Sequence, residues 1–248
     1  MAIVIKTAQQ IEKMRVASRL VKGAFDLAES MIAEGVTTRE IDDAVVKFLK
    51  TRGAKASFKN YRNFPKSCCI SINEEIIHGI PGPRRLQDGD IVSIDIGAYI
   101  GGFHGDAART FAVGSVAPEA ARLIDVTRDS FFAGMAYARK GCFLNQVSAA
   151  IQDYAESQGF YIVTDYVGHG IGAALHEAPE IPNFRQKIRG PKLRPGMTLA
   201  IEPMLNMGTA DIVTLADGWT VITADGKPSA HYENTVLITE GEPEILTL

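Results

Sequence analysis

Residues 86–95 read LQDGDIVSID, and residues 193–202 read LRPGMTLAIE, 107 positions later in the chain. In both stretches a Leu is followed three residues later by a Gly, and then by an apolar, β-type run that ends in an acidic residue. These acidic residues are Asp95 and Glu202. An acidic side chain in an apolar strand is costly unless it is paired or binds a cation. The two stretches therefore predict two equivalent strands, each with a carboxylate that belongs to a functional site.

The similarity between the two parts of the chain extends to their helices. Gly35 and Gly53 are 18 residues apart, and so are Gly141 and Gly159, which lie 106 positions later. Each pair encloses an amphipathic helical pattern, and a longer helical pattern precedes each pair. The repeat predicts two αβ halves of similar construction.

We expect a single domain of the α+β class, residues 1–248, in which halves at about 1–117 and 118–248 share one sheet. Thr37 and Glu40 have the capping-box spacing that begins a helix, and Pro118 is a good first residue of another. The expected helices are 8–33, 37–53 and 118–141, and the expected short strands are 69–72, 76–77, 91–96 and 110–113.

Composition excludes several classes of protein. The 26 basic and 29 acidic residues give a net charge of −3, which does not indicate a basic surface for nucleic acids. The three cysteines, Cys68, Cys69 and Cys142, form neither a disulfide framework nor a zinc motif. No apolar run is long enough to span a membrane. We therefore expect a cytoplasmic enzyme or binding protein, with no nucleic-acid sequence recognition and no membrane contact.

Three further side chains join Asp95 and Glu202 as candidate metal ligands. Asp106 follows His-Gly, Glu233 precedes an apolar strand, and His169 is flanked by glycines, which leave its ring uncrowded and its backbone flexible. Each of the five also has an ordinary interpretation. A carboxylate could pair with Lys or Arg, Asp106 could be a turn residue, and His169 could be an exposed turn histidine.

Together, the four carboxylates carry a charge of −4, which two divalent cations would neutralise while the imidazole stays neutral. Oxygen-rich ligation with one nitrogen suits Mn²⁺, Fe²⁺, Co²⁺ or Zn²⁺, and a pair of such ions is a common design of hydrolases. His78 and His176 occupy corresponding positions in the two halves. They bind no metal in this interpretation, but could donate hydrogen bonds to a substrate.

The five residues and their surroundings resemble those of the bacterial, type I methionine aminopeptidases. The motifs keep the family's order and extend over essentially the whole chain. The resemblance implies the pita-bread fold, in which pseudo-twofold αβ halves share a curved, mainly antiparallel sheet with helices on its outer face. The matching motifs are SINEEIIHGIP (71–81), DIG (95–97), HGD (104–106), GHGIG (168–172), HEAP (176–179), IEPM (201–204) and DGWT (217–220).

The resemblance also implies a reaction, which is hydrolysis of the initiator methionine from nascent proteins whose second residue is small and uncharged. The cofactors would be two divalent metal ions, from among Co, Mn, Fe, Zn and Ni. Asp95 would hold one ion, His169 and Glu202 would hold the other, and Asp106 and Glu233 would bridge both.

Three residues would act on the substrate in the same analogy. Glu202 would serve as the general base, His78 would contact the scissile amide nitrogen, and His176 would contact the carbonyl oxygen. The partners would be the N-terminal peptide of nascent proteins and, transiently, the ribosome. We expect the protein to be a monomer.

A methionine pocket is the last feature that the resemblance implies, although aromatic residues of this kind are also common in an ordinary core. An apolar pocket can bind a thioether side chain by contact alone. The pocket residues would be Phe58, Tyr61, Phe64, Cys69, Leu175 and Trp219.

The chain departs from the family's pattern beside Glu233. The family usually has Gln where this chain has His231, and His where it has Asn234. Because side chains alternate along a strand, His231 faces the same side as Glu233. We therefore hypothesise that His231 contacts a metal ligand and influences which metal is preferred.

Two alternative functions remain. A prolidase or aminopeptidase P shares the fold and the five ligands, but usually has an additional N-terminal domain for which this chain has no room. A non-catalytic binding module of the same fold typically lacks the ligands, all five of which are present here.

Overall fold

The computed structural model describes residues 2–248, which form four α-helices and fifteen strands. The helices are α1 (Ala8–Ser30), α2 (Thr38–Thr51), α3 (Pro118–Met135) and α4 (Leu144–Ser157). The strands are β1 (Lys55–Ala56), β2 (Cys68–Ile72), β3 (Glu75–Ile77), β4 (Ile91–Ile100), β5 (Phe103–Ala112), β6 (Tyr161–Ile162), β7 (Gly168–Gly170), β8 (Glu177–Ile181), β9 (Thr198–Ile201), β10 (Met204–Asn206), β11 (Ile212–Thr214), β12 (Val221–Thr223), β13 (Ser229–His231), β14 (Glu233–Leu237) and β15 (Glu244–Ile245).

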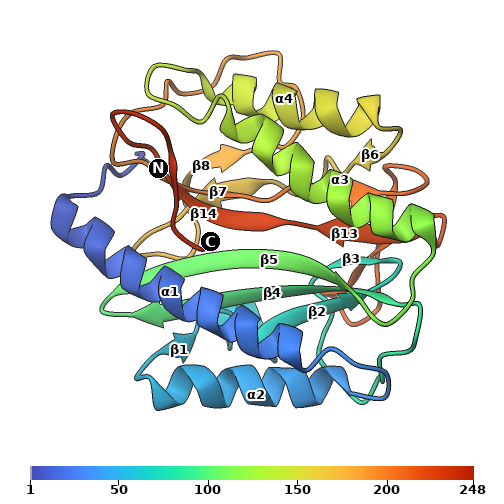
Figure 1. Cartoon of the computed structure of the whole chain (residues 1–248). Coiled ribbons are helices and arrows are strands. Elements are labelled where there is room, and N and C mark those ends of the chain that lie inside the picture. Colours follow the sequence, from blue (N-terminus) through green and yellow to red (C-terminus); the bar gives the residue numbers. More distant parts are fainter. Residues whose placement is uncertain (1) are drawn as a thin grey trace.

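Nine of these strands form one antiparallel sheet, and the four helices cover one of its faces (Figure 1). The order of strands is β1-β4-β5-β14-β9-β7-β8, with β2 also paired to β4 and β15 to β14. Two three-stranded sheets, β13-β10-β6 and β11-β12-β3, complete the β-structure. The prediction of an α+β fold with a mainly antiparallel sheet is confirmed.

The three predicted helices begin within one residue of the expected positions, but all three end early, and the second ends at Thr51 instead of Gly53. Thr37 and Glu40 form the expected capping box at the start of α2. The first helix ends at Ser30 instead of Ala33. The third ends at Met135 instead of Gly141, because the chain tightens into turns and Gly141 then donates to the carbonyl of Leu193. Within residues 2–248, no helix is both long and apolar enough to cross a membrane.

Alternation along the central strands separates an apolar face from a polar one. In β4, Ile94 and Ile96 pack against α1 and α2, so Asp95 between them points to the opposite face. In β9, Leu199 and Ile201 pack against α3 and α4 in the same way. The expected strands 91–96 and 110–113 lie almost entirely within longer strands. β4 and β5 have ten residues each and pair along their whole length, joined by a turn of two glycines.

The two parts of the chain meet where β5 pairs with β14. Only two residue pairs form this ladder, and threonine hydroxyls continue it at both ends. The Thr110 hydroxyl accepts from the N–H of His231 and donates to its carbonyl, both at 2.9 Å. The Thr235 hydroxyl does the same with Asp106, at 3.0 and 2.8 Å. Strands from residues before 118 therefore lie on one side of this junction, and strands from later residues on the other.

The N-terminal segment is attached to the second part of the sheet by a buried ion pair. Lys6 donates from its ammonium group to the carboxylate of Glu177, and the two side chains are only 2% and 10% exposed. The backbone N–H of Lys6 also donates to Gly196, at 2.8 Å. Glu177 in turn accepts from the N–H of Ala174, at 3.2 Å. The segment thus fixes the loop that precedes β8.

We predict that Lys6→Met will lower the free energy of unfolding by about 3–5 kcal/mol, because it leaves the carboxylate of Glu177 buried and uncompensated. Urea unfolding followed by circular dichroism measures this loss. The control is Lys22→Met, which breaks an exposed pair with Asp26 on α1 and should cost about 0.5 kcal/mol. Equal small losses in both variants would contradict a structural role for the buried pair.

Candidate active site

The five candidate ligands project from the face of the sheet that the helices do not cover. Asp95 lies in β4, Asp106 in β5, His169 in β7 and Glu233 in β14, and Glu202 follows directly after β9. Strands from both parts of the chain therefore contribute to one cluster, which lies across the junction of β5 and β14.

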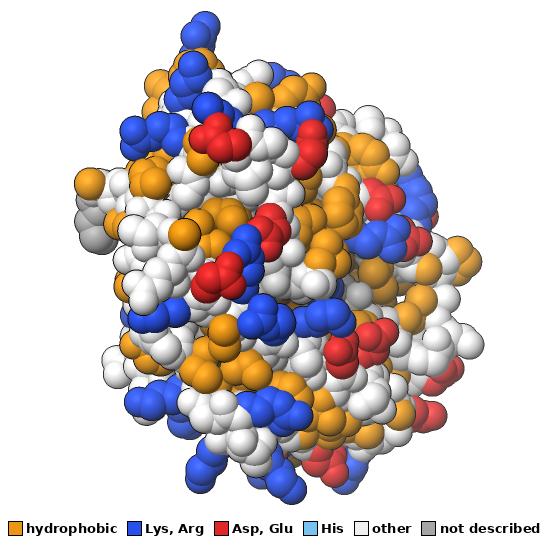
Figure 2. Space-filling view, turned by 60° about the vertical axis from the view of Figure 1, so that its left-hand side comes forward, with side chains coloured by type: hydrophobic (Ala, Val, Ile, Leu, Met, Phe, Trp, Pro, Cys, Tyr) orange, Lys and Arg blue, Asp and Glu red, His pale blue; other side chains and the backbone are white. Residues whose placement is uncertain are grey.

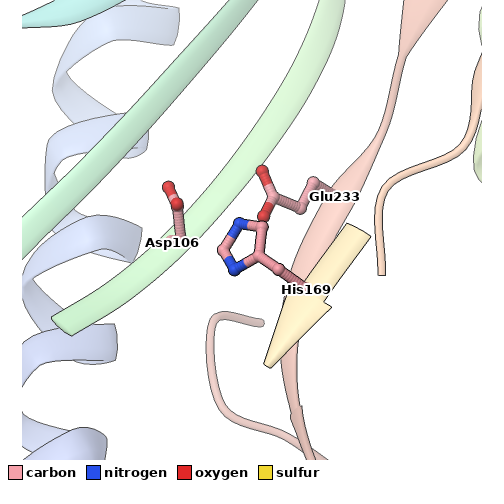
Figure 3. Close-up of side chains that lie close together, drawn as sticks. All are labelled: Asp106, His169 and Glu233. Atoms are coloured by element: carbon pink, nitrogen blue, oxygen red, sulfur yellow. The ribbon is translucent and has the colours of Figure 1, made fainter. Parts of the chain in front are cut away.

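Distances within the cluster are short enough for a shared cation. Asp106, His169 and Glu233 each offer a ligand atom, and these three atoms lie within 4.8 Å of one another (Figure 3). Glu202 Oε1 lies 3.7 Å from His169 Nε2. Asp95 interacts with Asp106 through their carboxyl groups. The structure thus brings all five residues together, while the role of each remains a prediction.

The glycines around His169 allow close packing of strands. A Cβ at Gly168 would lie 2.3 Å from the carbonyl oxygen of Ala200, and one at Gly170 would lie 2.2 Å from that of Ala178. The expected flexible backbone is therefore wrong, because β7 is held between β8 and β9. An exposed turn is also excluded, since the histidine is buried.

One nitrogen of His169 is free to bind a cation. Its Nδ1 lies 2.9 Å from the carbonyl oxygen of Gly170, and because a carbonyl only accepts, Nδ1 must carry the proton. The unprotonated Nε2 then points toward the carboxylates, as in many metal sites. Burial lowers the pKa of this imidazole to about 4, so it is neutral at pH 7.

Burial and mutual repulsion make the four carboxylates poor acids. Burial raises the pKa of Asp95 to about 8, although a hydrogen bond with Asp106 opposes this shift. Burial also raises the pKa of Asp106, Glu202 and Glu233 well above the usual range, and the negative charges of neighbouring carboxylates raise each further. Four such groups can all ionise only if a cation compensates them.

The protein itself does not supply that cation. Three buried oxygens, Asp95 Oδ1, Asp106 Oδ1 and Glu233 Oε1, have no hydrogen-bond partner within residues 2–248. Arg109 is a half-buried cation nearby, but its guanidinium donates to the carbonyl of Glu233 and the side-chain oxygen of Asn234. Unpartnered carboxylate oxygens beside a neutral imidazole fit divalent metal ions.

An apolar cavity of about 280 Å³ opens beside this cluster. Its wall includes all six residues predicted for the methionine pocket, and Asp95, Asp106 and Glu202 also face it. Several of the six form one packed group with Met14, Ile171 and Ala200, which gives the pocket a rigid wall. The six are Phe58, Tyr61, Phe64, Cys69, Leu175 and Trp219.

The two predicted catalytic histidines also line the cavity. The ring of His176 stacks on Tyr61 with centroids 5.1 Å apart, and lies 4.0 Å from the ring of His169. His78 lies edge-on to Tyr166, at 5.6 Å, and has a backbone φ of 60°. Burial lowers the pKa of His78 to about 4. Partial desolvation in the cavity lowers the pKa of His176, a residue that is still exposed to solvent, to about 3. Both rings are therefore neutral and can donate one N–H each.

His231 and Asn234 face opposite sides of the sheet. His231 is buried, lines the cavity, and has no hydrogen-bond partner at Nε2 within the described chain. Asn234 accepts from Arg109 and from the hydroxyl of Thr247, at 2.5 and 2.9 Å. His231 therefore faces the cavity, whereas its position on the same side as Glu233 stays a prediction and its influence on metal preference a hypothesis.

Sequence reasoning did not identify several residues of the cavity. Ile77 lies within the quoted motif 71–81, but an apolar side chain does not indicate a role in chemistry. Arg62, Asp165, Tyr166 and Val167 come from loops, and only their positions in space bring them to the cavity.

Comparisons with known proteins agree with this geometry. The model of metallopeptidase family M24 matches residues 12–240. The methionine aminopeptidase of Clostridium perfringens is 52% identical over 246 residues, which is 99% of each chain. A crystal structure of methionine aminopeptidase from Rickettsia prowazekii has a TM-score of 0.97 and 40% identity, with 100% of both chains covered.

A more distant structure shares the fold alone. The prolidase from Pyrococcus horikoshii has a TM-score of 0.79 at 23% identity, and this chain covers 63% of it. The resemblance inferred from the motifs, and the pita-bread fold that it implied, are confirmed by the full-length relatives. The family model covers most of the chain and the relatives match it over its full length, so the chain belongs to metallopeptidase family M24.

Proposed function

We propose that the protein is a metal-dependent aminopeptidase that removes an N-terminal methionine when the second residue is small and uncharged. The observation that carries this proposal is the position of the carboxylate–histidine cluster beside an apolar cavity. The names of the full-length relatives support the same activity. The cavity suits an unbranched thioether side chain, and the cluster suits the metal-dependent hydrolysis of the adjoining peptide bond.

In this proposal the protein holds two divalent ions, of Co, Mn, Fe, Zn or Ni. Asp95 would hold one, His169 and Glu202 would hold the other, and Asp106 and Glu233 would contribute to both. When bound, the ions would supply Lewis acidity for the hydrolysis. The unpartnered carboxylate oxygens support this assignment.

The remaining side chains bind and orient the substrate. The apolar wall of the cavity takes the methionine side chain, and the acidic cluster attracts the free α-amine. His78 contacts the scissile amide nitrogen, and His176 donates to the carbonyl oxygen, where negative charge develops. Glu202 takes the proton of the attacking water as the general base. Lowered pKa values support the neutral, donating form of both histidines.

One chain supplies every part of this site, so we propose a monomer with one catalytic domain, residues 1–248. Asp95 and Asp106 come from the half at about 1–117, and the other candidate ligands come from 118–248. Neither half would hold the ions alone. A cytoplasmic location fits an enzyme of nascent chains, and the cysteines are free, as reducing conditions require.

A transient association with the ribosome is part of the same proposal. Residues 47–59 include Lys47, Lys50, Arg52, Lys55 and Lys59 and no acidic residue. All five basic side chains are exposed. Such a surface suits weak, salt-sensitive contact with ribosomal RNA, without sequence recognition.

Peptide hydrolysis tests the proposed activity. With added Mn²⁺ or Co²⁺, we expect release of methionine from Met-Ala-Ser, and roughly a hundredfold lower kcat/KM for Met-Leu-Ser, whose second side chain is too large. Gly-Pro and Xaa-Pro peptides are the control substrates, because a prolidase or an aminopeptidase P cleaves before proline. Cleavage of these alone would contradict the proposal, and no hydrolysis with any metal would favour a binding module.

Thermal unfolding tests the carboxylate cluster. The folded-state pKa of Asp95 is about 8, above its ordinary value, so the metal-free protein should lose stability as pH rises toward 8. The histidines shift in the opposite direction, but their contribution is complete above about pH 7. We therefore expect Tm of the metal-free protein to fall by about 3–5 °C between pH 7 and 8.

Added Mn²⁺ should remove this fall, because it compensates the ionised carboxylates. Glu233→Gln removes one of them and should weaken both the pH dependence and the stabilisation by metal. Asp26→Asn, on the surface of α1, should leave both unchanged. A Tm that is independent of pH and of metal would show that the cluster is not the cation site.

A further inference from the structure

Two exposed side chains of opposite charge stand at the mouth of the active-site cavity. Arg62 and Asp165 both line the cavity and are exposed, whereas its other charged residues, Asp95, Asp106 and Glu202, are buried or half-buried. Neither Arg62 nor Asp165 takes part in an ion pair within residues 2–248. An unpaired charge at the mouth of a cavity is available to a ligand.

The loop that carries Arg62 has an unusual backbone. Asn60, Arg62 and Asn63 have φ values of 65°, 48° and 72°, in the left-handed region that costs a residue other than glycine free energy. Hydrogen bonds from Asn60 N to Phe64 O, at 2.9 Å, and from Phe64 N to Tyr61 O, at 2.8 Å, close the loop. Strain maintained in this way is concentrated at functional sites.

The loop places Arg62 close to the catalytic histidine. Its guanidinium lies 5.5 Å from the ring centroid of Tyr61, and Tyr61 stacks on His176. Burial is the main cause of the lowered pKa of His176, and the positive charge of Arg62 is a further cause. Arg62 is therefore near the peptide bond that the proposed function places at His176.

The direction of the substrate follows from the proposed function, on which this inference rests. The methionine side chain fills the apolar part of the cavity, and the amine faces the acidic cluster. Residues beyond the second must then leave through the mouth, past Arg62 and Asp165. We propose that these two residues form a subsite for the third residue of the substrate, in which Arg62 favours a carboxylate and Asp165 opposes it.

The chemistry of the two groups determines the preference. A guanidinium pairs with a carboxylate through two parallel hydrogen bonds, and its charge does not depend on pH. Asp165 repels the same carboxylate and attracts a basic residue. Because exposed ion pairs are weak, we expect kcat/KM for Met-Ala-Asp-Ser to exceed that for Met-Ala-Lys-Ser about two- to fivefold at low salt. The difference should lie in KM, and 0.5 M NaCl should remove it.

Charge reversal is the direct test, with Met-Ala-Asn-Ser as the neutral reference peptide. Arg62→Glu should invert the order of the acidic and basic peptides, and Asp165→Asn should increase the preference for the acidic one. Arg19→Glu changes an exposed cation on α1 that does not line the cavity, and should leave the order unchanged. If kcat/KM ranks the three peptides in the same order for Arg62→Glu as for the wild type, the proposal is overturned.

A binding measurement separates this inference from the proposed function. Trp219 lines the cavity and is the one tryptophan of the chain, so its fluorescence reports peptides there without catalysis. Glu202→Gln with bound metal lacks the proposed general base, so it should bind uncleaved Met-Ala-Asp amide more tightly than Met-Ala-Lys amide, and the additional change Arg62→Glu should reverse this. Failure to cleave any methionyl peptide would refute the proposed function. Cleavage with equal affinity for the two tripeptides would refute the charged subsite alone.

Discussion

Repulsion among four buried carboxylates is the constraint on which the site depends. Burial raises the pKa of each of them, and neighbouring negative charge raises those of Asp106, Glu202 and Glu233 further, so the cluster favours a bound cation or bound protons. Alternation along β4 and β9 sends their apolar residues to the helices and their acidic residues to the other face, and the pairing of β5 with β14 then brings the groups together. Figure 2 shows that acidic and basic side chains are mixed on one face of the molecule. The net charge of −3 is a sum over the whole chain, and therefore does not reveal that four carboxylates gather in one cluster.

The same arrangement links metal binding to recognition of the substrate. His169 belongs to the cluster, its ring adjoins that of His176, and His176 stacks on Tyr61 of the cavity wall. The loop before β8 carries His176, and the buried pair of Lys6 and Glu177 holds this loop against the N-terminal segment. Desolvation keeps the two histidine rings neutral, which suits hydrogen-bond donation more than charge attraction.

Much of the fold and of the candidate site could be predicted from local signals in the sequence. The structure has the capping box predicted at Thr37. It also has the strand that carries Asp95 and the strand that ends directly before Glu202. The reason is that alternation and capping depend on neighbouring residues only. The end of α3 could not be predicted, because a contact with Leu193, distant in the sequence, replaces the last turns.

Contacts between distant residues also explain what the sequence did not reveal. The hydroxyls of Thr110 and Thr235 join β5 to β14, yet nothing near either threonine indicates that role. Arg62 and Asp165 reach the mouth of the cavity from separate loops. Gly168 and Gly170 suggested a flexible backbone, whereas the structure needs them because neighbouring strands leave no room for a Cβ.

The most direct test of the account is the location of the metal. Crystals grown with Mn²⁺, measured at a wavelength where manganese scatters anomalously, would show the ions without reference to activity. We predict anomalous peaks within coordination distance of Asp106, His169 and Glu233, with Asp95 and Glu202 completing the ligands. Peaks elsewhere in the protein, or an occupied surface site and none at this cluster, would contradict the account.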